Sequence, residues 1–132
     1  MRNSIALLAL ACAPFVACKP PAAPANTADD PPRAPAAATP EAEAAQVFAG
    51  RCSPCHGATG AGDGAAAAAL NPRPRNFREA AWQSGVTDAQ IEQVIRQGGA
   101  AMGKSAAMPA NPDLDGKPAV VAALRAMIRG MR

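Results

Sequence analysis

The sequence contains few large side chains from which to build a hydrophobic core. Its 132 residues include no tyrosine, one tryptophan and three phenylalanines, and a large part of its 49% hydrophobic content is alanine. Alanine buries little area per residue, so a core of this composition stabilises a fold only weakly. The composition therefore predicts either a marginal domain or a domain that a large apolar cofactor completes.

Runs of charge and strand patterns are also scarce. The net charge of +3 comes from scattered residues, and no run of lysine and arginine is interleaved with aromatics. Nothing in the sequence therefore supports nucleic-acid binding. No stretch alternates between apolar and polar residues as a half-buried strand does. The length suits one domain with appendages, and we expect that domain to be all-α.

The first residues have the pattern of an export signal. Arg2 precedes an apolar run from Ile5 to Ala17, which has the length of a signal-peptide core and is too short to span a bilayer. The run ends in Phe15-Val16-Ala17-Cys18, which resembles the lipobox of bacterial lipoproteins, and a lipobox ending at Cys12 would leave too short an apolar region. We expect residues 1–17 to be a lipoprotein-type signal peptide and Cys18 to be lipid-anchored. The alternative is an ordinary cleaved signal whose cysteine carries no lipid.

A segment rich in proline and alanine follows, over residues 18–40. It shows no apolar periodicity, and its composition cannot bury enough surface to fold by itself. We expect this segment to be a flexible tether between a membrane anchor and a folded domain over residues 41–132.

Helix signals divide the folded domain into three main helices. The first is capped by Thr39 and runs into residues 52–56, where Gly57 stops it. The second opens with a capping box, Thr-Asp-Ala-Gln at 87–90, and ends at Gly98-Gly99. The third begins around Pro118. An irregular loop joins the first two helices.

The chemistry of the domain is concentrated in Cys-Ser-Pro-Cys-His, residues 52–56. A redox dithiol uses this cysteine spacing, but in a framework of strands that the sequence does not show. A structural zinc site needs four ligands, and the domain has no cysteine or histidine besides Cys52, Cys55 and His56. Cys-x-x-Cys-His is the signature of covalent haem attachment, in which the sulfurs bond one edge of the porphyrin and the histidine ligates the iron. We favour haem c over the other two interpretations.

Residues 41–132 resemble the class I c-type cytochromes, the small monohaem bacterial kind. The resemblance is strongest in "CSPCHGATGAGDG" (52–64), "LNPRPRNF" (70–77) and Met108-Pro109. It implies a fold of three main helices and loops wrapped around one covalently bound haem. Phe48 matches an aromatic of the family that packs across the C-terminal helix, and Ala44 stands where the family usually has glycine.

A methionine is the expected second axial ligand of the iron. The sequence has a single histidine, so the opposite side must use another residue type, and a His/Met pair raises the reduction potential. Met102 and Met108 both lie in the loop after the second helix. The Met-Pro motif of the family favours Met108, with Met102 as the alternative.

The resemblance implies further contacts around the haem. A proline carbonyl in the family accepts the hydrogen bond of the proximal histidine, and Pro72 is the first choice for it, with Pro74 as the second. Arg73 and Arg75 either neutralise haem propionates or are solvated, and Trp82 either donates to a propionate or covers the haem. The residues expected in the haem pocket are Leu70, Pro72, Arg75, Phe77 and Trp82.

Single-electron transfer by a membrane-tethered periplasmic cytochrome is the function that these features predict. With both axial positions filled the iron has no open site, so we expect an electron carrier without catalytic residues. The alternatives are an electron-entry haem subunit of a larger oxidoreductase complex and, less favoured, a haem peroxidase or sensor. The expected partners are unidentified redox proteins and the membrane that holds the lipid, and we expect a monomeric domain.

Overall fold

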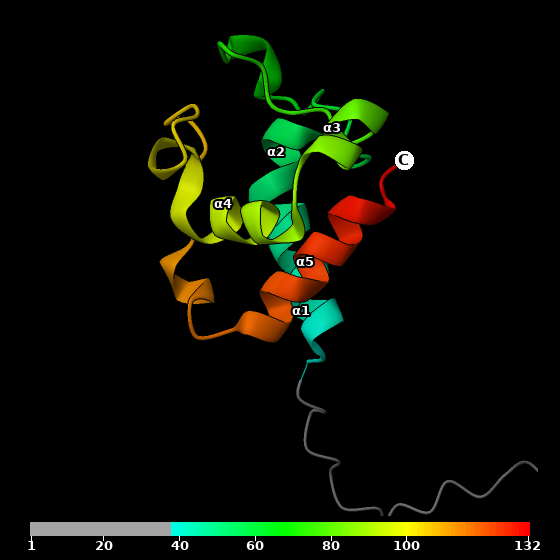
Figure 1. Ribbon diagram of the computed structural model, residues 1–132, viewed down its shortest axis with the longest axis vertical. Helices are drawn as coiled ribbons and strands as arrows, with labels where there is room; N and C mark the ends of the chain where they lie inside the picture. Colours follow the sequence, from blue (N-terminus) through cyan, green and yellow to red (C-terminus); the bar gives the residue numbers. More distant parts are fainter. Residues whose placement is uncertain (1–37) are drawn as a thin grey trace, which may run out of the picture. The chain divides into compact units, whose positions relative to one another are not determined.

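The computed structural model describes residues 38–132. The predicted signal peptide, Cys18 and most of the predicted tether lie outside the described residues. Within them the chain forms helices and connecting loops and no strand, which confirms the predicted all-α class (Figure 1). The helices are α1 (Pro40–Val47), α2 (Ser53–His56), α3 (Ala80–Gly85), α4 (Asp88–Ala101) and α5 (Pro118–Gly130).

The first predicted helix is a continuous segment of three parts. As predicted, Thr39 caps it: its hydroxyl accepts a hydrogen bond from the Ala42 amide at 3.2 Å, and Pro40 occupies the first turn. A π-helical turn over Phe48–Cys52 joins α1 to α2, which the sequence did not predict. Gly57 ends the segment with a φ of 79°, a conformation that glycine adopts without steric cost.

The other two predicted helices are also confirmed. At the start of α4, the Thr87 hydroxyl accepts from the Gln90 amide, and the Gln90 side chain accepts from the Thr87 amide. The helical path breaks at Gly98, where φ is 77°, and one more turn follows to Ala101. Helix α5 begins at Pro118 as expected. Helix α3 lies in a stretch where no helix was predicted.

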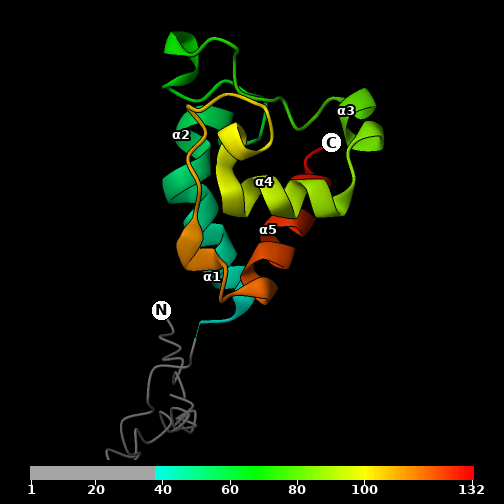
Figure 2. The same ribbon diagram turned by 60° about the vertical axis from the view of Figure 1, so that its left-hand side comes forward.

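The core lies where α5 packs against α1 and α4, and Figures 1 and 2 both show α5 crossing α1. Ala44 and Phe48 are 0% and 5% exposed in the same buried cluster as Leu124 of α5. The small side chain of Ala44 therefore permits a close helix crossing, and Phe48 fills the space beside it. The remaining large buried residues of this cluster are Phe77, Ile91, Ile95, Leu114, Val120, Val121 and Ile128.

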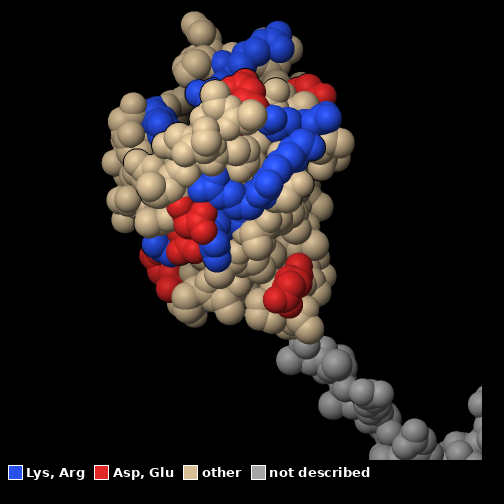
Figure 3. Space-filling view, turned by 45° about the vertical axis from the view of Figure 1, so that its right-hand side comes forward, with Lys and Arg blue, Asp and Glu red and all other residues tan. Residues whose placement is uncertain are grey.

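Ion pairs between elements surround this core. Arg51, in the π-helical turn, makes two hydrogen bonds to Asp113, at 2.8 and 2.9 Å, and Lys117 lies 2.5 Å from Glu43. Basic side chains form a diagonal stripe on the face in Figure 3, with acidic side chains next to it. Exposed pairs of this kind contribute little individually, because water and salt screen them. The fold therefore depends mainly on the buried helix contacts.

Candidate functional site

A cavity of about 860 Å³ lies beside α2, α3 and α4. Its volume is in the range of pockets that hold small molecules and cofactors. Every site residue predicted within the described part of the chain lines it: Cys52, Cys55, His56, Leu70, Pro72, Arg75, Phe77, Trp82, Met102 and Met108. The structure thus brings together residues that are up to 56 positions apart, from position 52 to position 108.

The two cysteines that line the cavity are free thiols and half-buried. Burial raises the pKa of the Cys52 thiol above its ordinary value, and the nearby Arg51 offsets only part of this effect. A redox dithiol needs an attacking cysteine whose pKa is lowered. The surroundings of Cys52 therefore do not favour dithiol chemistry.

His56 is buried and held through its ring nitrogen Nδ1, which lies 3.0 Å from the Arg75 carbonyl oxygen. A carbonyl can only accept, so Nδ1 carries the hydrogen and donates it, and Nε2 keeps its lone pair. Burial lowers the pKa of His56, and the bond to the carbonyl acts in the opposite direction with a smaller effect. A neutral imidazole with a free Nε2 is the form that binds a metal.

The prediction that a proline carbonyl accepts this bond is wrong. The acceptor is Arg75, and the Pro74 carbonyl instead lies against Gly62, where a side chain on Gly62 would come within 2.7 Å of it. Pro72 lines the cavity without a hydrogen bond to His56. Which carbonyl of this irregular loop reaches the histidine depends on how the loop packs against residues 57–64.

The loop after α2 satisfies the last carbonyls of that helix. The amides of Gly62, Gly64 and Ala66 donate to the carbonyls of His56, Cys55 and Pro54, at 2.8, 3.1 and 2.9 Å. Helix ends leave such carbonyls without partners, and here the glycine-rich loop supplies the donors. The segment predicted as an irregular loop therefore also fixes the end of the Cys-x-x-Cys-His helix.

Two aromatic side chains adjoin the histidine. The ring of Phe77 stacks on the imidazole of His56 with centroids 4.4 Å apart and planes inclined by 15°. Trp82 lies beyond Phe77 at a centroid distance of 5.3 Å and is half-buried. Phe77 was predicted only as a residue of the pocket lining. The structure shows in addition that it contacts His56, the candidate iron ligand, directly.

Met102 and Met108 approach the cavity from the segment after α4, residues 102–111, which we name the methionine loop. The Gly99 amide donates to the Met108 carbonyl at 2.9 Å. A side chain on Gly99 would lie 2.1 Å from the Ser105 carbonyl oxygen, so only glycine lets the loop approach α4 this closely. Both methionines are half-buried.

Basic residues outnumber acidic ones around the cavity. Its charged lining residues are Arg51, Arg73, Arg75, Lys104 and Glu79. The Arg75 guanidinium pairs with Glu79 at 3.0 Å, while its carbonyl serves His56. Sequence reasoning missed the main-chain role of Arg75 and the presence of Arg51 and Lys104. These basic side chains would therefore attract an anionic group bound in the cavity.

The donor set fits a covalently attached haem. The cavity combines two thiols, a histidine with a free nitrogen and two thioether sulfurs with an apolar lining that includes Ile91 and Ile95. Among residues 38–132, no group of three or more His, Cys, Asp or Glu side chains is arranged to hold a metal ion by itself. No helix of the described part is long and apolar enough to cross a membrane.

Comparison with known proteins agrees with this site. Residues 39–128 match the model of the family described as "Cytochrome C oxidase, cbb3-type, subunit III". No curated protein and no solved structure matches the sequence significantly. The family match covers more than half of the chain and includes the whole cavity lining. The chain therefore belongs to this family of c-type cytochrome domains, which bind haem c covalently and act in electron transfer.

Proposed function

We propose that the protein transfers single electrons through one haem with His/Met-ligated iron. Cys52 and Cys55 would form the thioether bonds, His56 would bind the iron through Nε2, and Met108 would bind it on the other side. The observation that supports this proposal is that these four side chains line one cavity and that Nδ1 of His56 is already engaged. When bound, the haem iron alternates between its ferric and ferrous states and so holds one electron.

The other pocket residues have supporting roles in this proposal. The Arg75 carbonyl orients the imidazole and makes it a stronger ligand. Leu70, Pro72, Phe77 and Trp82 line the cavity and would limit the access of water. Met102 is the alternative to Met108, because it lines the same cavity from the same loop.

The test is the absorption spectrum of the protein, made in cells with a cytochrome-maturation system, oxidised and reduced. We expect low-spin c-type bands with haem that remains attached after denaturation, and a weak red band from methionine sulfur bound to ferric iron. Met108→Ala should lose the red band, and the matched variant Met102→Ala should keep it. Loss of the band in Met102→Ala alone would assign the ligand to Met102. A native high-spin spectrum would favour a peroxidase or sensor.

We further propose that the domain is tethered on the periplasmic side of a bacterial membrane. Residues 1–17 would be removed, Cys18 would carry the lipid, and residues 18–40 would link the anchor to the domain. Cys18→Ala should move the haem protein from the membrane fraction to the soluble periplasmic fraction. If the variant stays with the membrane, the lipid anchor is not what holds the protein there.

A role as haem subunit of a larger oxidoreductase is the second candidate, and the family match favours it, since the family is described as an oxidase subunit. A subunit and a free carrier would use the same ligands and cavity. Purification from membranes in mild detergent distinguishes them. A subunit elutes with partner proteins at constant stoichiometry, and a free carrier elutes alone.

A further inference from the structure

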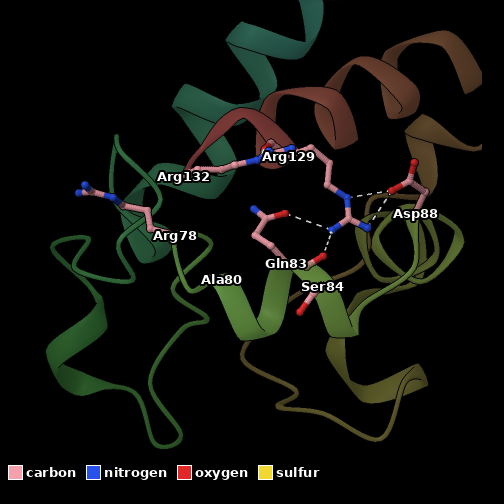
Figure 4. Close-up of a pocket in the computed structure, with 7 residues that line it drawn as sticks. All are labelled: Arg78, Ala80, Gln83, Ser84, Asp88, Arg129 and Arg132. Carbon is pink, nitrogen blue, oxygen red and sulfur yellow. Dashed lines mark hydrogen bonds and ion pairs between the residues drawn. The ribbon is translucent and has the colours of Figure 1, made fainter.

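Arg129, in the last turn of α5, binds the end of α3 and the start of α4 (Figure 4). Its Nη1 donates to the carbonyl and the side-chain oxygen of Gln83, at 2.5 and 3.1 Å, and its Nη2 donates to the Val86 carbonyl at 2.7 Å. Its Nε donates to Asp88 at 2.8 Å. The side chain is only 21% exposed, so these are partly desolvated, charge-assisted bonds.

Gln83 links the Arg129 side chain to the backbone of Phe77, which lines the haem cavity. Its side-chain nitrogen donates to the Phe77 carbonyl at 2.7 Å and to the Ile128 carbonyl at 2.9 Å. Both amide hydrogens and the amide oxygen of Gln83 therefore have partners. The side chain ties the backbone of Phe77 to the last turn of α5, 45 residues away from Gln83.

Apart from these bonds, helix α3 contacts the core through the half-buried Trp82, which packs beside Phe77. It has six residues, none of them buried, and no side-chain cap at its start. Helices this short are unstable in isolation and depend on tertiary contacts. Both ribbon views show α3 next to the C-terminal end of α5, where Gln83 and Arg129 make their bonds (Figures 1 and 2).

The segment that Gln83 anchors includes the contacts to the histidine. Arg75 supplies the carbonyl that accepts from His56 Nδ1, and Phe77, two residues later, stacks on the imidazole. We name Arg75, Phe77 and Trp82 the proximal wall. Residues 75–77 are consecutive, so a shift of their backbone would change the hydrogen bond to His56 and the stacking on its ring at the same time.

We infer that Gln83 and Arg129 are positioning residues of the haem site: they hold the proximal wall against His56 and so maintain the hydrogen bond from His56 Nδ1 to the Arg75 carbonyl. The inference rests on the proposed function, in which His56 is the axial ligand. Neither residue belongs to the Cys-x-x-Cys-His signature of haem attachment at residues 52–56. Their effect on the site comes through Phe77 and its backbone.

The exchange rate of the His56 Nδ1 hydrogen with solvent tests this inference in the haem-loaded protein. The chain has one histidine, so ¹⁵N-labelled histidine gives a single Nδ1 signal whose assignment is unambiguous. Gln83→Ala removes the bonds to Phe77 and Ile128, and Arg129→Gln removes the charged bonds to α3. We expect each change to accelerate the exchange roughly tenfold to a hundredfold, the effect of losing one such bond.

Two variants serve as matched controls. Arg125→Gln removes an arginine from the same helix that pairs with Asp88 and Glu92 but not with α3. Gln93→Ala removes a half-buried glutamine whose side chain, within residues 38–132, bonds only Gln97. Both should leave the exchange rate within about twofold of native. Arg129→Lys keeps the charge but not the forked geometry, so it should restore only part of the protection.

The outcomes separate this inference from the proposed function. If Arg129→Gln and Arg125→Gln accelerate exchange equally, in proportion to their loss of global stability, the residues are merely structural and the inference is overturned. If Gln83→Ala leaves the rate unchanged, the inference also fails, even where Arg129→Gln does not fold. A native protein without covalent haem or without histidine ligation would instead overturn the proposed function.

Discussion

The two sides of the haem cavity are held by different kinds of contact. On the side of His56, side chains from distant elements meet. Phe77 stacks on the imidazole, Gln83 donates to the Phe77 carbonyl, and the half-buried Arg129 donates in turn to Gln83. On the other side, main-chain contacts at the end of α4 hold most of the methionine loop. One of its side chains, Asn111, donates to the Ile95 carbonyl at 2.8 Å and accepts from Arg51, whose side chain is 47% exposed.

This difference indicates which side of the cavity opens first when the fold is destabilised. Partly buried bonds to main-chain carbonyls are screened little by salt and costly to leave unpaired, whereas exposed ion pairs contribute little. The methionine loop has one such side-chain bond, from Asn111 to the Ile95 carbonyl, and otherwise depends on its close approach to Gly98 and Gly99, which any added atom would prevent. We expect the methionine side to open under conditions where the histidine side stays closed.

Gly99→Ala should have the largest effect, because the added carbon would lie 2.1 Å from the Ser105 carbonyl oxygen and the methionine loop must move away. We expect loss of the red methionine band while the haem remains attached and bound to histidine. Gly116→Ala is the control, since no atom lies within 4 Å of its added carbon. A Gly99→Ala protein with a native spectrum would show that the loop adapts without moving the methionine.

Phe77→Ala tests the histidine side. Phe77 is 6% exposed, and removing a buried aromatic side chain costs about 3–5 kcal/mol of unfolding free energy. Phe77→Leu keeps most of the volume but not the stacked ring, so it should cost less. Chemical denaturation gives the free energy, and the red band reports the methionine. The comparison between the two sides would be wrong if Phe77→Ala released the methionine but left the unfolding free energy unchanged.

Acid should lower the stability of the fold on both sides of the cavity, by less than the Gly99 and Phe77 substitutions do. The hydrogen bond with Arg129 lowers the pKa of Asp88, and that with Arg51 lowers the pKa of Asp113. Groups with a lowered folded-state pKa stabilise the fold above their unfolded pKa of about 3.9. Their contribution is lost as the pH falls further through the folded value. Unfolding measured between pH 6 and pH 2.5 should therefore show decreasing stability below pH 4.

Replacing each aspartate in turn distinguishes how much each side of the cavity contributes to the acid dependence. Asp88→Asn and Asp113→Asn should each be less stable than native at pH 6 and should each lose less stability on acidification. Asp63→Asn, which changes an exposed aspartate without an ion pair in the described residues, is the control. If both variants keep the acid dependence of the native protein, other groups cause it.

Contacts between distant residues account for what could not be predicted. Helix α3 has only six residues and no apolar period, so no local pattern indicates it. The carbonyl that serves His56 was assigned to the wrong residue, because sequence spacing in an irregular loop does not tell which carbonyl turns inward. Two partners of Arg129 are main-chain oxygens 43 and 46 residues away, which no local pattern indicates.

The sequence by itself determined the all-α class, the starts of the three main helices and the candidate haem-binding residues that meet in the cavity. Caps, prolines and glycines act over a few residues, and the Cys-x-x-Cys-His spacing is itself local chemistry. Only the tertiary structure decided how the histidine is oriented, which aromatic contacts it and what holds the two sides of the cavity. Those features arise where loops and helix ends pack together, and packing depends on the whole chain.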